Sequence, residues 1–418
     1  VKDPQLGLHN WIVSFDLNSL YPHLIMQYNL SPETLVGVQP KNMGVENYLN
    51  EKFNLQWARD KNVTVAPNGS MYRRDKQGFL PELMEKMYGD RVVFKKKTIE
   101  AKKEFQKTKD PIYKNEISRC NNIQMAKKIA LNSAYGAIGN QYFRYFDVRI
   151  AEAITLGGQL SIRWVERDVN KFMNKLLNTD NVNYVVASDT DSIYLKLDKL
   201  VEKVCKDKSP QQITDFINKA AEDKIQKVID DSFNNLAKYV NAYQQKMIMK
   251  REAIANKAIW VAKKRYMMNV FDEEGIRFDI PKLKIMGVEA VKSSTPEVCR
   301  GKIKDAIRVI MNDSEDALIK FVADFKEVFK TLSPEEVAFP RSCNYIDKYV
   351  DPNSIYKKGT PIHVKGALIY NHHILKNKLQ RKYPLIKDGD KIKFLMLRQP
   401  KTVKDTVIYF ETKIPYEF

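Results

Sequence analysis

Three aspartates of this 418-residue chain stand where they could support phosphoryl-transfer chemistry. Asp16 ends an apolar stretch typical of a strand, and Asp189 and Asp191 lie in a tight turn between two further apolar stretches. Residues two apart face the same side of an extended chain, so both turn carboxylates can reach one site. Carboxylates on strand ends are suitable ligands for Mg²⁺, and a bound cation relieves their mutual repulsion. The alternative is an ordinary aspartate-rich turn.

Two groups of polar residues share helical faces and could bind phosphate. Arg91 and Lys95 are four positions apart, and Lys128, Asn132 and Tyr135 follow at spacings of four and three. Arginine offers a forked donor to phosphate oxygens, whereas lysine is a point charge. Each group alone is equally typical of a solvated helix face.

Strands and helices must position these groups. The sequence predicts a strand over residues 11–16, a short helix over 23–28, and irregular structure over 38–78. A pair of antiparallel helices should follow. Their predicted ranges are 81–109 and 113–135, with a break at Asp110-Pro111 and a C-cap at Gly136.

The second half of the chain predicts a mixture of helices and strands without regular βαβ spacing, which favours an α+β fold. The predicted helices are 148–178, 211–245, 296–311 and 315–329; the predicted strands are 182–187, 192–197, 258–270 and 277–285, with short strands after His363.

The charge balance indicates a polyanionic partner. The chain has 70 Lys and Arg against 51 Asp and Glu, a net charge of +19. The excess is concentrated in residues 71–140 and 361–405, which suits a protein that holds a nucleic-acid backbone at two places. The four cysteines have no C-x-x-C spacing, which argues against zinc or a disulfide framework, and no apolar run reaches the roughly 20 residues of a membrane span.

Three segments in order resemble the polymerase motifs A, B and C of family B DNA polymerases. They are Ser14-Phe15-Asp16-Leu17-Asn18-Ser19-Leu20-Tyr21-Pro22, Lys128-Ile129-Ala130-Leu131-Asn132-Ser133-Ala134-Tyr135-Gly136 and Asp189-Thr190-Asp191-Ser192. Lys263-Lys264-Arg265-Tyr266, Lys284-Ile285-Met286-Gly287 and Lys292-Ser293-Ser294-Thr295-Pro296 extend the resemblance to the polymerases of T-even-type bacteriophages.

The resemblance implies a right-hand architecture with an antiparallel-sheet palm, helical-hairpin fingers and a mostly helical thumb. The expected divisions are palm 1–77, fingers 78–140, palm 141–288 and an apparently truncated thumb 289–418. The implied activity is DNA-templated DNA synthesis by two-metal nucleotidyl transfer in viral replication.

Roles for individual residues follow from the same resemblance. Asp16, the Leu17 carbonyl and Asp191 would hold two Mg²⁺ ions, which Mn²⁺ could replace, with Asp189 as a supporting catalytic carboxylate. The implied nucleotide-binding residues are Ser19, Leu20, Tyr21, Arg91, Lys95, Lys128, Asn132 and Tyr135. The implied DNA-binding residues are Lys263, Lys264, Arg265, Tyr266 and Lys292, and the supporting residues are Thr190, Gly136 and Glu252. Tyr21 would exclude a 2′-hydroxyl by steric contact.

The implied partners are primer–template DNA and deoxynucleoside triphosphates. The family carries an N-terminal domain and a 3′–5′ exonuclease before motif A, so we expect a longer parent protein or a separate polypeptide for these, and no proofreading by this chain. We also expect this chain to lack the family's sliding-clamp-binding tail, which leaves a clamp partner open. The expected location is the cytoplasm of an infected bacterial host, with no membrane contact.

Two departures from the family pattern stand out. Ala187-Ser188 precedes Asp189 where Tyr-Gly is usual, and the serine should restrict a positive φ in the turn. His23 replaces the usual small residue after Tyr21-Pro22; like the other four histidines, it has no metal-ligand spacing and is interpreted as structural or surface.

Other functions remain open from the residues alone. An RNA polymerase or reverse transcriptase is disfavoured by Tyr21 and the Asp-Thr-Asp turn. A non-catalytic DNA-binding subunit of a split polymerase would have no use for clustered acids near phosphates. A two-metal nuclease would have no use for the stripe formed by Lys128, Asn132 and Tyr135.

Overall fold

The computed structural model describes residues 2–39, 43–398, 407–411 and 413–416. The chain forms two compact units. One comprises Val1–Lys263 and Val270–Lys282, and the other comprises Lys264–Asn269 and Leu283–Phe418. No helix within the described ranges combines the length and apolar character needed to cross a bilayer.

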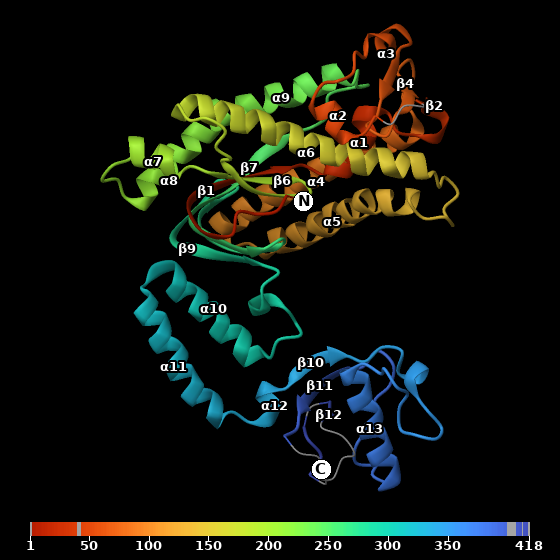
Figure 1. Ribbon diagram of the computed structural model, residues 1–418, viewed down its shortest axis with the longest axis vertical. Coiled ribbons are helices and arrows are strands. Elements are labelled where there is room, and N and C mark those ends of the chain that lie inside the picture. The colour runs from red at the N-terminus through yellow and green to blue at the C-terminus, as the bar shows by residue number, and fades with distance from the viewer. Residues whose placement is uncertain (1, 40–42, 399–406, 412, 417–418) are drawn as a thin grey trace. The chain divides into compact units, whose positions relative to one another are not determined.

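A six-stranded sheet carries the first motif (Figure 1). Its order is β5-β6-β1-β7-β8-β9, and β1 pairs antiparallel with β6 and β7. The strands are β1 (Gly7–Leu17), β5 (Val185–Asp189), β6 (Ser192–Lys196), β7 (Met249–Ala262), β8 (Arg265–Glu273) and β9 (Ile276–Met286). The predicted strand over 11–16 lies within β1, whose residues 12–15 are fully buried at the centre of the sheet.

The strand predicted over 258–270 is wrong in one respect, because a turn divides it. Lys264 adopts a left-handed φ of 59°, which ends β7 and starts β8. The alternating apolar residues continue through this turn, so periodicity alone did not reveal it.

Long helices pack around the first core. The prediction of 148–178 agrees with α6 (Val148–Leu177), which contacts α1 (Leu20–Tyr28) and α9 (Gln226–Tyr239). The prediction of one helix over 211–245 is corrected to α8 (Pro210–Ala220), a π-helical turn (Ala221–Ile225) and α9. Helix α9 ends early because Asn241 is left-handed and its amide donates to the Ala58 and Val63 carbonyls. A short helix, α7 (Asp198–Val204), follows β6.

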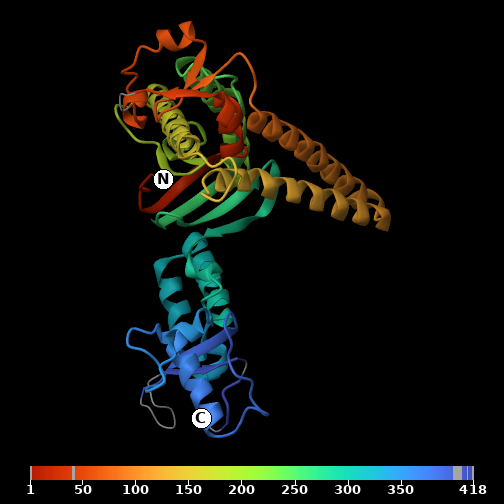
Figure 2. The same cartoon turned by 90° about the vertical axis from the view of Figure 1, so that its right-hand side faces the viewer.

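The predicted helical pair is confirmed as α4 (Phe79–Thr108) and α5 (Pro111–Ile138), which lie side by side in both views (Figures 1 and 2). Asp110 caps α5 by accepting a hydrogen bond from the Ile112 N–H at 2.9 Å. Gly136 is inside the helix rather than its C-cap: burial of Ile138 favours another half-turn, and the cap is Gly139.

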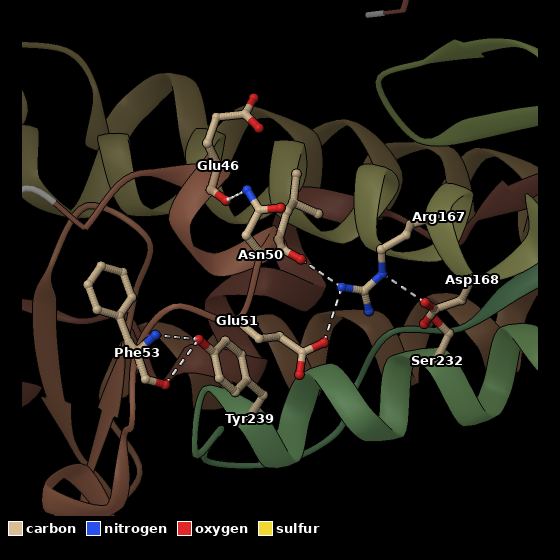
Figure 3. Close-up of polar contacts among 9 residues, drawn as sticks. Glu46, Asn50, Glu51, Phe53, Arg167, Asp168, Ser232 and Tyr239 are labelled. Carbon is tan, nitrogen blue, oxygen red and sulfur yellow. Dashed lines mark hydrogen bonds and ion pairs between the residues drawn. The ribbon is translucent and has the colours of Figure 1, made fainter. Parts of the chain in front are cut away.

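Residues 38–78 are more regular than predicted, since strands of three or four residues give little periodicity. They contribute to a sheet of order β2-β4-β3 and two short helices. These are β2 (Leu35–Val38), β3 (Val63–Val65), β4 (Ser70–Arg73), α2 (Val45–Leu49) and α3 (Gln56–Asp60). Arg167 of α6 contacts the end of α2 and the residues after it. It donates a hydrogen bond to the Leu49 carbonyl at 2.7 Å and forms an ion pair with Glu51 at 3.2 Å (Figure 3).

The second unit has its own apolar core, in which Tyr409 of β12 packs against Gly366 of α13. This unit consists mainly of helices and also contains a three-stranded sheet of order β10-β11-β12. Its elements are α10 (Glu297–Asn312), α11 (Glu315–Thr331), α12 (Pro334–Val337), β10 (Phe339–Ser342), α13 (Ile362–Lys376), β11 (Lys391–Met396) and β12 (Val407–Phe410). The prediction of short strands after His363 is corrected, because the chain forms helix α13 there and the strands β11 and β12 follow this helix. Residues 399–405 of the late basic block lie outside the described residues.

Candidate active site

Asp16 and Asp191 converge at one end of the central sheet. Asp16 lies opposite Ser192 in the β1–β6 register, and the Leu17 N–H donates to the Asp191 carbonyl at 2.8 Å. Both aspartates line a cavity of about 570 Å³. Strand pairing therefore joins acids that are distant in the sequence.

The cavity joins these acids to the helical cations. The walls come from residues 16–22, from α4 and α5, from the β5–β6 turn and from the β8–β9 turn. The lining residues are Asp16, Leu17, Asn18, Ser19, Leu20, Tyr21, Pro22, Arg91, Lys95, Lys128, Asn132, Thr190, Asp191 and Glu274. A polyanion with bound cations is the kind of ligand that such paired surfaces of opposite charge can hold.

The β5–β6 turn separates the roles of its two aspartates. Thr190 and Asp191 form the loop, because Asp189 pairs with Ser192 at the strand ends. Asp189 is not among the described residues lining the cavity, and its carboxylate accepts a hydrogen bond from the Thr190 hydroxyl at 3.0 Å. Asp191 thus lines the cavity together with Asp16, and the supporting role of Asp189 stays a prediction.

Ser188 was expected to restrict a positive φ in the turn, but it does not occupy the left-handed position. Ser188 lies inside β5 and is buried, and the left-handed residue of the turn is Thr190, with φ of 50°. A glycine at 188 is therefore not needed for the turn geometry, because a strand residue has negative φ.

The loop after Asp16 turns sharply into α1. Ser19 adopts a left-handed conformation (φ 48°, ψ 59°), and its hydroxyl accepts a hydrogen bond from Arg91 Nη1 at 3.0 Å. The Tyr21 ring packs on Tyr135 of α5 with centroids 4.7 Å apart. These contacts connect the loop with both long helices.

An ion pair fixes the register of α4 against α5 beside the cavity. Lys127 Nζ lies 2.7 Å from Asp90 Oδ2, and this hydrogen bond holds the pKa of Asp90 below its usual range. The neighbours of this pair in the chain are Arg91 and Lys128, which both line the cavity.

Glu252 lies beside the site at a β-bulge. The β1–β7 register passes from Ser14–Ala253 to Phe15–Arg251, which leaves Glu252 as the extra residue. The Ser14 hydroxyl donates to its carboxylate at 3.1 Å. Glu252 is not among the described lining residues of the cavity.

Two charged residues near the aspartates were not predicted. Glu274 lines the cavity from the β8–β9 turn, where its N–H donates to the Glu252 carbonyl at 2.7 Å. Lys250 lies directly opposite Asp16 in the β1–β7 register. The sequence Asp272-Glu273-Glu274-Gly275 is a turn signal that could have identified the first, whereas the second depends on strand register.

The expected DNA-binding cations lie at the β7–β8 turn and beyond it, and ion pairs are seen among them. Lys263 pairs with Asp3 at 2.8 Å, and Arg265 and Lys292 both pair with Glu289, at 2.7 and 3.1 Å. The pairing of Arg265 with Glu289 keeps its guanidinium near the turn.

The backbone around this turn is tightly packed. Tyr266 is 6% exposed and therefore packs inside the protein. Gly287 has φ of +65°, and a Cβ there would lie 2.1 Å from the Lys264 carbonyl oxygen. Only glycine fits such an approach, which explains the glycine of the Lys284–Gly287 segment.

Comparison with known proteins identifies the family of this chain. The family model for DNA polymerase family B matches residues 1–413. The DNA-directed DNA polymerase of Escherichia phage RB69 is 33% identical over 98% of this chain and 50% of its own length. That of Enterobacteria phage T4 is 32% identical over 100% and 51%, and DNA polymerase 1 of Pyrococcus abyssi is 27% identical over 81% and 34%. The chain spans about half the length of the phage relatives, and it belongs to DNA polymerase family B.

Proposed function

We propose that this chain is the catalytic core of a DNA-templated DNA polymerase of viral replication. The observation that carries the proposal is the convergence of Asp16 and Asp191 with Arg91, Lys95 and Lys128 around one cavity. Nucleotidyl transfer needs this combination, because carboxylates hold cations and cationic side chains hold the triphosphate.

The donor set suits Mg²⁺. Among the described residues, no group of three or more His, Cys, Asp or Glu side chains forms a ready-made metal cage. Mg²⁺ is usually held by one or two carboxylates together with substrate phosphates, which is what Asp16, Asp191 and the Leu17 carbonyl offer. Two bound ions, Mg²⁺ or Mn²⁺, would lower the pKa of the primer 3′-hydroxyl and neutralise the leaving pyrophosphate.

The residues of α4 and α5 would orient the incoming nucleotide. The guanidinium of Arg91 and the ammonium groups of Lys95 and Lys128 would bind the β- and γ-phosphates. The Asn132 side chain and the backbone of Ser19 and Leu20 would complete this phosphate-binding site. The primer 3′-oxygen then forms a bond to the α-phosphorus as the bond to the bridging oxygen breaks. Its proton leaves to solvent and pyrophosphate departs.

Tyr21 would select the sugar. Its ring is fixed against Tyr135, so it cannot easily move aside for a 2′-hydroxyl. An enclosed hydroxyl without a hydrogen-bond partner carries an energetic penalty, which favours deoxynucleotides.

Lys263, Lys264, Arg265 and Lys292 would bind the primer–template backbone. Contacts with phosphate position a duplex without reading its sequence, as copying requires. The carboxylates that pair with three of these cations would be exchanged for phosphates on binding. Tyr266 would support this turn from within.

The subdomain layout that we propose follows the motifs. Residues 1–77 and 141–288 would form the palm around Asp16 and Asp191, 78–140 the fingers, and 289–418 the thumb. This layout is supported by the helical pair α4–α5, which carries Arg91, Lys95 and Lys128.

Primer extension with Mg²⁺ and four deoxynucleotides tests the proposal. The wild-type chain should extend the primer, while Asp16→Asn and Asp191→Asn should each lower the rate by about a thousandfold, in line with other losses of essential charge stabilisation. Asp60→Asn, at an exposed acid of α3, is the matched control and should extend normally. DNA binding without extension by wild type would instead indicate a non-catalytic subunit.

A further inference from the structure

His23 has no part in the proposed chemistry, yet it is almost completely enclosed where α1 meets α4. Its side chain is 3% exposed. A buried imidazole needs partners for its nitrogens, and His23 Nδ1 lies 2.9 Å from the Ser19 carbonyl oxygen. The ring also packs edge-on against Tyr88 of α4, with centroids 4.4 Å apart at 85°.

The contact with Ser19 determines the tautomer. A carbonyl oxygen only accepts, so Nδ1 must carry the proton. Burial, together with the nearby charges of Lys246 and Arg91, lowers the pKa of His23, although the hydrogen bond to Ser19 acts in the opposite direction. His23 is therefore a neutral Nδ1–H donor at neutral pH.

This donor acts on a residue in a disfavoured conformation. Ser19 is left-handed, which serine adopts rarely. Its carbonyl accepts the His23 backbone N–H at 3.2 Å as well as the ring Nδ1–H. Two hydrogen bonds from one residue thus hold the Ser19 peptide.

Ser19 in turn holds Arg91. The Ser19 hydroxyl accepts from Arg91 Nη1 at 3.0 Å, and no other hydrogen bond of this guanidinium is found among the described residues. Arg91 Nε is buried and has no partner there. The direction of the Arg91 fork therefore depends on where the Ser19 hydroxyl is held.

The two contacts with α4 form one unit. Tyr88 and Arg91 are three positions apart, so they project from the same side of α4. One packs on the ring of His23 and the other bonds to Ser19, the N-cap of the same helix α1. Loss of His23 would loosen both contacts at once.

We propose that His23 is a positioning residue, whose Nδ1–H fixes the Ser19 peptide and thereby aims the Arg91 fork at the triphosphate of the incoming nucleotide. This inference rests on the proposed role of Arg91 in nucleotide binding. It gives a function to a residue at which the chain departs from its family's usual pattern.

A matched pair of amides tests the proposal in single-nucleotide primer extension by the 418-residue chain. The amide nitrogen of His23→Asn can take the place of Nδ1, whereas that of His23→Gln extends one methylene too far. His23→Gln should raise the KM for the nucleotide about five- to tenfold, the loss expected for one hydrogen bond, with kcat changed less than about twofold. His23→Asn should stay within about twofold of wild type in both constants.

A double-variant cycle tests whether His23 acts on nucleotide binding through Ser19 and Arg91. Ser19→Ala removes the hydroxyl that holds Arg91, so adding His23→Gln to it should raise the KM by no more than about a further twofold. Three results would each overturn the proposal. The KM increases of Ser19→Ala and His23→Gln could multiply in the double variant, His23→Gln could lower kcat alone, or His23→Asn and His23→Gln could raise the KM equally.

Two further measurements distinguish failure of the His23 proposal from failure of the proposed function. If the Gln variant does not fold, ¹⁵N NMR of histidine-labelled wild type still decides, since a neutral Nε2–H form of His23 would contradict the proposal. A wild-type chain that extends no primer, or Asp16→Asn and Asp191→Asn variants that extend normally, would refute the proposed function itself. Normal extension with an unchanged KM in His23→Gln would refute only the role of His23.

Discussion

The charged residues that line the cavity come from different elements according to the sign of their charge. Asp16 and Asp191 come from the sheet, whereas Arg91, Lys95 and Lys128 come from α4 and α5. The acids and the cations thus reach the cavity from separate elements. We propose that metal cations and the triphosphate of a nucleotide bind between these two groups of side chains.

The fixed ring of Tyr21 leads to a prediction about sugar selection. Tyr21→Ala should increase incorporation of ribonucleotides relative to deoxynucleotides about ten- to a hundredfold, the range expected for a steric pocket of this kind. Tyr21→Phe keeps the ring and its packing on Tyr135, and should discriminate like wild type. The ratio of kcat/KM for the two nucleotides measures the effect, and an unchanged ratio in the alanine variant would remove the steric role.

The buried His23 predicts a pH dependence of stability. Its pKa is lowered in the folded protein, so the unfolded chain binds the proton more readily and folding weakens as pH falls below about 6.5. Arg91 and Lys246 add to this, because both would repel an imidazolium. The decrease in Tm from pH 7.5 to pH 5.5 should be smaller in His23→Asn than in wild type. Equal decreases would mean that His23 does not titrate in this range.

Elements are joined by polar contacts as well as by the core. Asp90 and Lys127 align α4 with α5, and both side chains keep some exposure, so the pair contributes more to register than to stability. Arg167 connects three segments, because it bonds to the Leu49 carbonyl and pairs with Asp168, which in turn accepts from Ser232 of α9 (Figure 3). Its guanidinium also lies over the Trp164 ring, 4.0 Å from the ring centroid.

Register between the long helices should affect nucleotide use. Asp90→Asn weakens the bond to Lys127 and should raise the nucleotide KM about two- to fivefold, with little change in Tm. The exchange Asp90→Lys with Lys127→Asp restores opposite charges and should recover at least half of this loss. Failure of the exchanged pair to recover would indicate that Asp90 acts through something other than Lys127.

The Arg167 junction should stabilise the fold without affecting the reaction directly. Arg167→Met keeps much of the apolar stem but removes the hydrogen bonds, and should lower the free energy of unfolding by about 1–3 kcal/mol. Urea unfolding monitored by tryptophan fluorescence measures this, and Arg163→Met, at a more exposed pair on the same helix, should cost less than about 1 kcal/mol. A larger effect at Arg163 would contradict the assignment of the junction to Arg167.

Across the whole molecule, the net charge of +19 favours binding to any nucleic-acid backbone. The two basic groups have different expected roles: residues on α4 and α5 meet a small triphosphate, and those around the β7–β8 turn meet a duplex.

These roles predict opposite phenotypes for two lysines. Lys264→Ala should weaken primer–template binding and reduce the slope of log affinity against log salt by about one, because one phosphate contact is lost. Lys128→Ala should raise the nucleotide KM and leave DNA binding nearly unchanged. Fluorescence anisotropy of labelled DNA and steady-state extension separate the two, and reversed phenotypes would exclude both assignments.

Local patterns in the sequence predicted much of the fold. The α4–α5 pair, α6, α10 and α11 follow from helical periodicity, Asp110-Pro111 and the long amphipathic runs. Short strands in residues 38–78 and the turn at Lys264 were missed or merged, because a three-residue strand or a single left-handed residue leaves almost no periodic signal. Helix α13 was missed for another reason: residues 366–370 are a continuous buried apolar run, which does not distinguish a helix from a strand.

The sequence by itself determined which residue types were available, their order, and the family to which the motifs point. Only the tertiary structure decided that Asp191 rather than Asp189 lines the cavity with Asp16, that Glu274 joins it, and that His23 is buried against Ser19. These outcomes depend on strand register, a bulge and helix packing between distant segments. Such contacts form because folding buries the segments together, and no local pattern records which partner each segment meets.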